Sequence, residues 1–127
     1  MYPYLLVAIG GALGSVARFG AGAFVGRFWS GGFPLATLLI NIVGSLAMGL
    51  IAGWLARATP AWQEDARLFV AVGVLGGFTT FSAFSLDTMN LIERGEIGAA
   101  VLYVGLSVVA AIAGLYAGLL IIRGGAA

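Results

Sequence analysis

Long apolar runs alternate with short polar turns along this chain. A helix needs roughly 20 apolar residues to cross a membrane, and the runs at about 3–25, 33–57, 66–92 and 97–122 meet that length. The turns between them contain glycine, proline, tryptophan and charged residues, which are typical of the membrane interface. The first run is longer than the core of a signal peptide, so we expect it to be retained. The pattern predicts an all-α membrane protein with four transmembrane helices in a single domain, residues 1–127.

The third run contains a polar stretch at residues 76–85, with the sequence GGFTTFSAFS. Gly76 and Gly77 weaken a helix by about 1 kcal/mol each, and Thr79 and Thr80 are β-branched and only moderate helix formers. We therefore expect the helix to break between residues 76 and 80. Broken backbone inside a membrane is tolerated only where protein buries it, or where it lines a wet cavity or an ion site. This stretch is the first place to look for function.

Composition supports the membrane assignment and removes several chemistries. The chain is 61% hydrophobic and 9% charged, with a mean hydropathy of +1.09, and too few charges remain to cover the surface of a soluble domain. It contains no cysteine or histidine, which excludes thiolate catalysis, Cys/His zinc sites and histidine acid-base chemistry. The net charge of +1 provides no basic patch for nucleic acid, and no phosphate-binding motif for a nucleotide is present.

The arginines do not favour either orientation in the membrane. Four spans place both termini on one side, and the arginines divide as Arg57, Arg67 and Arg123 on that side against Arg18, Arg27 and Arg94 towards the other. Orientation follows the Lys/Arg imbalance between the two sides, and here the numbers are equal. Either copies insert both ways, or one orientation is decided by a weak bias or by the first helix. No internal repeat is visible, so inverted symmetry would require a second, antiparallel copy.

Polar residues lie at helical spacing within the spans. The second span places Thr37, Asn41 and Ser45 on one face, and the fourth places Tyr103 and Ser107 on another. Each set either contacts a ligand or bonds to a neighbouring helix, and both readings remain open. Small residues accompany both faces, as in seams where helix backbones approach closely.

Two charged residues lie within the spans. Arg18 faces a wet cavity or an acid, or else extends to the headgroups. Asp87 is the only acid well inside a span, and it either pairs with an arginine or lines a vestibule. Phe81 and Phe84 are three residues apart and share a face beside the expected break. Single phenylalanines usually face lipid or fill a core, but the positive edges of aromatic rings can also solvate a small anion weakly.

These motifs together resemble the Fluc family of bacterial fluoride channels, also called the CrcB family. The similarity covers essentially the whole chain and rests on GGALGSVAR at 10–18, NIVGS at 41–45 and GGFTTFSAFS at 76–85. It implies a fluoride-selective channel that exports fluoride passively across the inner (plasma) membrane. It also implies an antiparallel, dual-topology homodimer with two pores, which agrees with the balanced arginines.

The resemblance assigns roles to particular residues. Phe81 and Phe84 would present ring edges to fluoride, and Asn41 would donate its amide in the pore. Hydroxyls along or near the ion path would come from Thr37, Thr80, Ser82, Tyr103 and Ser107, with Arg18 near the vestibule. Backbone carbonyls of Gly76 and Thr79 would hold a structural sodium ion at the dimer centre, two from each subunit.

Three positions depart from the family pattern. Ala83 replaces a common threonine, Asp87 replaces a common glutamate, and Ala111 lacks a hydroxyl that some relatives carry. These changes affect the outer polar contacts rather than the central assembly.

The main alternative is a small multidrug-type proton-coupled exporter, which also has four spans. That chemistry requires a carboxylate in the membrane, typically in the first helix, and no acid precedes Glu64. An intramembrane enzyme is disfavoured because Asp87 has no partner at catalytic spacing. A purely structural membrane subunit is the remaining alternative, because glycine seams make good assembly surfaces.

Overall fold

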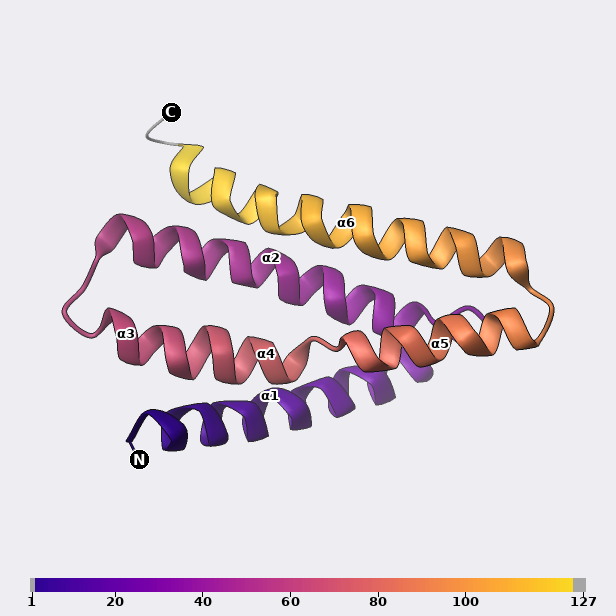
Figure 1. Cartoon of the computed structure of the whole chain (residues 1–127), viewed down its shortest axis with the longest axis horizontal. Helices are drawn as coiled ribbons and strands as arrows, with labels where there is room; N and C mark the ends of the chain where they lie inside the picture. The colour runs from indigo at the N-terminus through magenta and orange to yellow at the C-terminus, as the bar shows by residue number, and fades with distance from the viewer. Residues whose placement is uncertain (1, 125–127) are drawn as a thin grey trace.

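The computed structural model describes residues 2–124, which form a bundle of helices (Figure 1). The elements are α1 Tyr2–Gly26, α2 Leu35–Ala58, α3 Gln63–Ala66, the π-helix η1 Arg67–Leu75, α4 Gly76–Phe78, α5 Phe81–Glu93 and α6 Ile97–Gly124. Four segments are long and apolar enough to span a membrane: Tyr2–Gly26, Leu35–Ala58, Gln63–Glu93 and Ile97–Gly124. The third of these contains α3, η1, α4 and α5, with an interruption after Phe78. The prediction of four spans with a broken third helix is confirmed.

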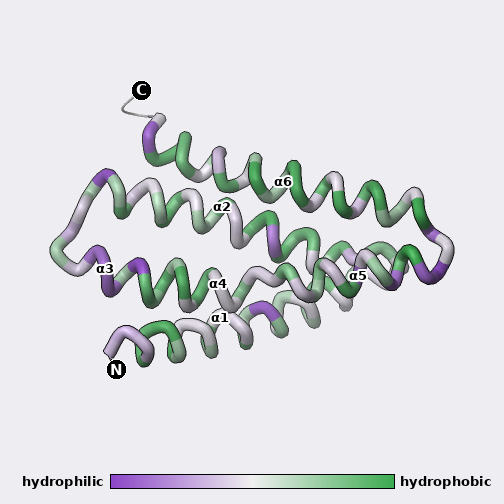
Figure 2. The backbone as a smooth tube through the Cα atoms, in the orientation of Figure 1, coloured by the Kyte–Doolittle hydropathy of each residue, from purple (hydrophilic) through white to green (hydrophobic). Residues whose placement is uncertain are grey.

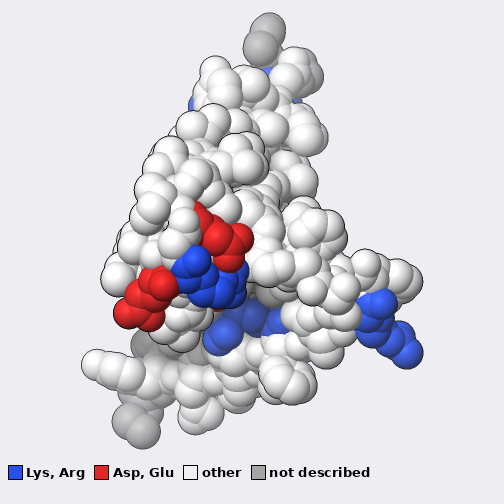
Figure 3. All heavy atoms as spheres, turned by 90° about the vertical axis from the view of Figure 1, so that its right-hand side faces the viewer, with Lys and Arg blue, Asp and Glu red and all other residues white. Residues whose placement is uncertain are grey.

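The polar residues lie mainly at the two ends of the bundle. The start of α1 and the end of α6 lie at the same end of the bundle in Figure 1. Hydrophobic positions dominate the helices between the connections in Figure 2. Figure 3 looks onto the opposite end, where acidic and basic side chains gather on an otherwise uncharged surface. Arg94 lies in the connection there, bonded to Glu96 at 2.7 Å and to the carbonyl of Gly32 at 3.0 Å. The bond to Gly32 joins the two connections at this end.

A tight turn reverses the chain between α5 and α6. Gly95 has a φ of +79°, a left-handed conformation that glycine adopts without strain. The N–H of Gly95 bonds to Ile92 O, and the N–H of Glu96 bonds to Leu91 O, both at 2.9 Å. This pair of bonds is the Schellman motif, which satisfies the last carbonyls of a helix. It returns α6 antiparallel to α5.

Glycines allow the helices to approach each other closely. α1 packs against η1 and α4, and α2 packs against α6. A Cβ added to Gly14 would overlap Val74 O and lie 2.9 Å from Phe78 N, while one added to Gly73 would lie 2.9 Å from the Cα of Gly10. A Cβ on Gly118 would similarly meet Leu50 N at 2.7 Å. Such small-residue seams are typical of membrane helices.

The break lies within the predicted interval, but the glycines are not its cause. Gly76 has helical angles of −63° and −38°, and α4 continues to Phe78. Gly77 instead serves packing, because a Cβ there would lie 2.6 Å from Gly11 O. The helix stops at Thr79 and Thr80, which are both extended. The π-helix η1, in which the N–H of Gly76 bonds to Ala71 O, had no signal in the sequence.

A small buried cluster lies between α2, α5 and α6. It consists of Leu38, Leu91, Ala100 and Tyr103, with Phe33 and Phe84 packed against it. Tyr103 is fully buried, and its ring meets that of Phe33 edge to face at 5.6 Å. This cluster supports the side of the break from which α5 begins.

Candidate functional site

Two consecutive threonines form the break in the third crossing. Thr79 has φ −81° and ψ 157°, and Thr80 has φ −150° and ψ 123°. The Thr79 hydroxyl donates to Leu75 O at 2.9 Å, which ties the break to the end of the preceding helix. The Thr80 hydroxyl accepts from the N–H of Ala83 at 3.1 Å and so caps the N-terminus of α5. Each threonine therefore anchors one side of the break.

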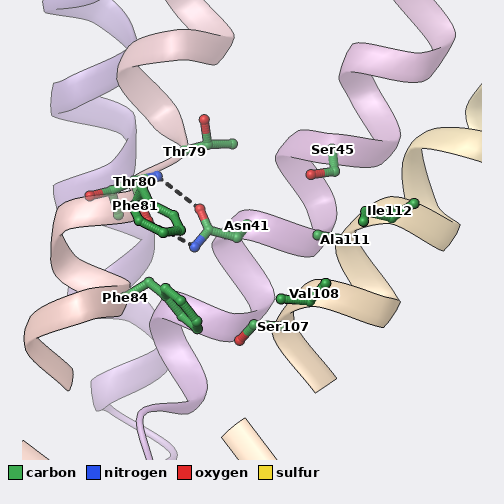
Figure 4. A pocket seen from close by; sticks show the side chains of 10 residues that line it. All are labelled: Asn41, Ser45, Thr79, Thr80, Phe81, Phe84, Ser107, Val108, Ala111 and Ile112. Atoms are coloured by element: carbon green, nitrogen blue, oxygen red, sulfur yellow. Dashed lines mark hydrogen bonds between the residues drawn. The ribbon is translucent and has the colours of Figure 1, made fainter. Parts of the chain in front are cut away.

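Asn41, in the middle of α2, holds the break from the side. Its Oδ1 accepts from the N–H of Thr80 at 2.8 Å, and its Nδ2 donates to Thr80 O at 3.0 Å (Figure 4). The paired bonds satisfy both polar groups of an extended residue within the membrane. Because the N–H of Thr80 needs an acceptor and its carbonyl needs a donor, the two bonds also identify which atom of the amide is Oδ1 and which is Nδ2. An amide nitrogen has two N–H groups, so one remains for another acceptor.

The carbonyls of Gly76 and Thr79 lose their helical donors at this break. In a continuous helix, Thr80 N–H would bond to Gly76 O, but here it bonds to Asn41. Ala83 N–H would bond to Thr79 O, but it bonds to the Thr80 hydroxyl. Released carbonyls at the C-terminal end of a half-helix are the ligands that hard cations take in membrane proteins. These two oxygens therefore have the chemistry of a cation site.

Arg18 of α1 also reaches the break. Its Nε donates to Gly77 O at 3.1 Å, and the side chain is half-buried. The guanidinium thus satisfies a third carbonyl released at the end of α4 and brings positive charge beside it. Of the readings left open by the sequence, the structure favours an inward-facing arginine over one extended to the headgroups.

Three aromatic rings form a continuous row beside the break. The ring centroids of Phe81 and Phe84 are 5.4 Å apart, and those of Phe84 and Tyr103 are 5.2 Å apart. Phe81 is 77% exposed in this single chain, whereas Phe84 is half-buried against the core cluster. The row leads from the surface of the protomer to its interior.

An open cleft of about 310 Å³ lies beside these rings. The lining comes from α2, the break, α5 and α6, namely Asn41, Ser45, Thr79, Thr80, Phe81, Phe84, Ser107, Val108, Ala111 and Ile112 (Figure 4). No lining residue carries a charge. Ser107 is only 7% exposed, and its Oγ has no hydrogen-bond partner within residues 2–124. A buried hydroxyl without a partner costs free energy, so this one is available as a donor to a group in the cleft.

The structure brings most of the predicted residues together, though not all in the cleft. Asn41, Thr80, Phe81, Phe84 and Ser107 line it with Thr79. Outside the lining, the Ser82 hydroxyl lies 3.3 Å from that of Thr80, and Thr37 lies beside the hydroxyl of Tyr103.

The structure also places Asp87 and Ser45. Asp87 accepts from the hydroxyl of Tyr103 at 3.1 Å, rather than pairing with an arginine. Ser45 lines the cleft, although the family resemblance assigned it no role. Its signal was its position one turn after Asn41 on the same face.

Comparisons with known proteins identify the family of this chain. Residues 5–119 match the family model described as CrcB-like protein, Camphor Resistance (CrcB). A Nitrobacter hamburgensis protein named "Fluoride-specific ion channel FluC 2" is 56% identical over 120 residues, covering 94% of this chain and 96% of the relative. Proteins named "Fluoride-specific ion channel FluC" from Novosphingobium aromaticivorans and Paracoccus denitrificans are 55% and 53% identical, covering 93% and 97% of this chain and 94% and 96% of the relatives. The chain belongs to the CrcB family.

Proposed function

We propose that this protein is a fluoride-selective channel, through which fluoride leaves the cell passively. Family membership makes the chain a multi-pass protein of the bacterial plasma membrane, and a transport protein rather than an enzyme. The observation that carries the proposal is the uncharged cleft beside the helix break, where Asn41 retains a free N–H and Ser107 a buried, unpartnered hydroxyl. The names of the relatives identify the anion that such donors would serve.

The cleft suits a small anion that must keep moving. Fluoride is strongly hydrated, so a path through the membrane must replace its water with several short donors. Asn41 and Ser107 would provide N–H and O–H donors, and the rings of Phe81 and Phe84 would provide positive edges. Because no lining residue is charged, the anion would be held weakly enough to leave. The fixed amide of Asn41 would favour an ion of one size.

The functional unit in this proposal is an antiparallel homodimer with two pores. The equal division of arginines between the two ends allows either orientation. Within one chain the cleft is open, and Phe81 at its edge is largely exposed. An inverted second copy would cover these surfaces and complete the wall of each pore.

A structural sodium ion would lie at the dimer centre, held by the carbonyls of Gly76 and Thr79 from both subunits. Two observations support this assignment. The N–H groups that would bond to these carbonyls in a continuous helix bond elsewhere, and the carbonyls lie at the C-terminal end of a half-helix, which carries partial negative charge. When bound, the cation raises the local potential for anions without entering their path. Asn41 and the Thr80 hydroxyl keep the two carbonyls free.

The direct test is ion release from liposomes that contain only the purified protein. We expect a fluoride electrode to record fluoride release far above that from empty liposomes, with chloride retained. Absence of fluoride release from intact protein would refute the channel assignment. Release of both anions would refute its selectivity.

The dimer has a separate test in single introduced cysteines, because the native chain has no cysteine. A cysteine in the 94–96 turn should react with an impermeant thiol reagent from both sides of the membrane. Reaction from one side only would exclude dual topology while leaving the channel proposal intact.

A further inference from the structure

A second cleft adjoins the cleft beside the break, further along α2 and α6. The second is also about 310 Å³, and its lining is Ser45, Ala111, Ile112, Leu115, Tyr116 and Leu119. Ser45, Ala111 and Ile112 line both clefts. These three residues therefore lie where the two clefts adjoin, and we call this place the passage.

At the level of this passage, α6 offers no polar side chain. Tyr103 and Ser107 follow one another at a spacing of one turn, but the next positions on that face are Ala111 and Leu115, which offer no side-chain donor. Among the residues that line both clefts, only Ser45 has a hydrogen-bond donor in its side chain. Beyond it, the second cleft has a single further donor, the hydroxyl of Tyr116.

The Ser45 hydroxyl is free to take this role. It lies one turn beyond Asn41 on α2, on the side of Ala111, as Figure 4 shows. The side-chain hydrogen bonds within residues 2–124 engage Asn41 and Thr80 in this region but not Ser45. A serine in mid-helix commonly bonds back to the carbonyl four residues earlier, and that bond is not formed here. Close packing of α2 on α6 is provided by Gly49 and Gly118.

From this geometry we infer that Ser45 is an anion-binding residue that joins the two clefts. Its hydroxyl donates to the anion as the ion moves between the Asn41 and Ser107 donors and the hydroxyl of Tyr116. Without Ser45, an anion at the level of Ala111 would have only apolar side chains around it, which is costly for a desolvated charge. The inference rests on the proposed channel function and extends its path along α2 and α6.

The test exchanges the hydroxyl between the two facing helices. Ser45→Ala should lower fluoride flux about tenfold or more, because a hydrogen bond to a charged group is worth at least that factor. Adding Ala111→Ser to Ser45→Ala should restore most of the flux, since it returns a hydroxyl to the same passage from α6. Ser15→Ala removes a serine hydroxyl from the middle of α1, outside both clefts, and should conduct like the native protein. Size-exclusion chromatography checks that each variant remains assembled.

The outcomes separate the inference from the function on which it rests. If the native protein releases no fluoride, both the channel function and the role of Ser45 are overturned. Native conduction with unchanged flux in Ser45→Ala would overturn the role of Ser45 alone. A loss that Ala111→Ser fails to restore would assign Ser45 to packing and also overturn it. If Ser45→Ala does not assemble, Ser45→Cys keeps the size with a weaker donor. In that variant a small thiol reagent should block flux, and conduction that stays unchanged after complete labelling would contradict the passage.

Discussion

The close packing of glycines between α1 and the third crossing predicts that a methyl group added at Gly14 destabilises the protein. In Gly14→Ala, the added methyl group would overlap Val74 O and lie 2.9 Å from Phe78 N, where ordinary contacts are 3.4–4 Å. Both neighbours are backbone atoms, so no side chain can rotate away. α1 must therefore move back by more than half an ångström. Overpacking of this kind typically costs about 1–3 kcal/mol.

A matched variant isolates the effect of packing from that of helix propensity. Alanine is favoured over glycine within a helix by up to about 1 kcal/mol. Gly22→Ala lies in the same helix with no atom of this chain within 4 Å of the added Cβ, so it should be neutral or stabilising. Gly14→Ala should be destabilising despite the same gain in propensity. The two substitutions are chemically identical and are expected to act in opposite directions.

The assay is heating of each purified variant in detergent, followed by size-exclusion chromatography to measure the midpoint for loss of assembled protein. We expect Gly14→Ala to melt several degrees below Gly22→Ala, using the usual conversion of about 1 kcal/mol to a few degrees for a small domain. Flux should also fall in Gly14→Ala, because Phe78 is the last helical residue before the break. Equal melting midpoints for Gly14→Ala and Gly22→Ala would refute the close approach of α1 to the third crossing.

Three further predictions concern the site itself. Asn41→Ala leaves the N–H and carbonyl of Thr80 unpaired, which costs about 1–3 kcal/mol of stability for each buried group. Both the melting midpoint and the fluoride flux should therefore fall, and an unchanged melting midpoint would contradict the positioning role of the amide. Arg18→Met removes the donor to Gly77 O, whereas Arg18→Lys keeps a donor in the side chain. Flux measured with a fluoride electrode should therefore decrease from arginine to lysine to methionine, and equal flux in the two variants would argue against a role for the bond to Gly77. Phe81→Ile and Phe84→Ile should both reduce fluoride flux in assembled protein, and Phe84→Ile should also lower the melting midpoint, because Phe84 packs on the core cluster within each chain. A Phe84→Ile protein with the melting midpoint of the native protein would contradict this packing role.

The spans and the break could be predicted from the sequence because both depend on local properties. Runs of apolar residues set the four spans, and the threonine pair set the break. The low helix propensity of Gly76 and Gly77 pointed to the interval in which the break lies, but these glycines do not cause the break. Gly77 stays helical and meets Gly11 O, since close contact with another helix outweighs the weak preference of glycine against helix.

The partners of the polar side chains depended on tertiary contacts. Asn41 and Thr80 are separated by 39 positions in sequence, and Arg18 and Gly77 by 59. The sequence identified Asn41 and Arg18 as unusual within a membrane, but no spacing rule connects either one to the break. Tyr103 and Asp87 became partners because the turn at Gly95 folds α6 back along α5. Such pairings follow only from the arrangement of the helices.

The helix break supplies opposite polarity to two neighbouring places. The first part of the third crossing ends at Phe78 with its carbonyls directed forward, and α5 begins at Phe81 with its free N–H groups directed back. The first end carries partial negative charge and the second partial positive charge. The proposed sodium ligands, Gly76 and Thr79, lie at the negative end, and the rings and donors proposed for fluoride begin at the positive end. Asn41 holds these ends apart by bonding both polar groups of Thr80. A straight helix would pair these groups internally and leave no free groups for either proposed site, so the break is the structural basis of both proposals.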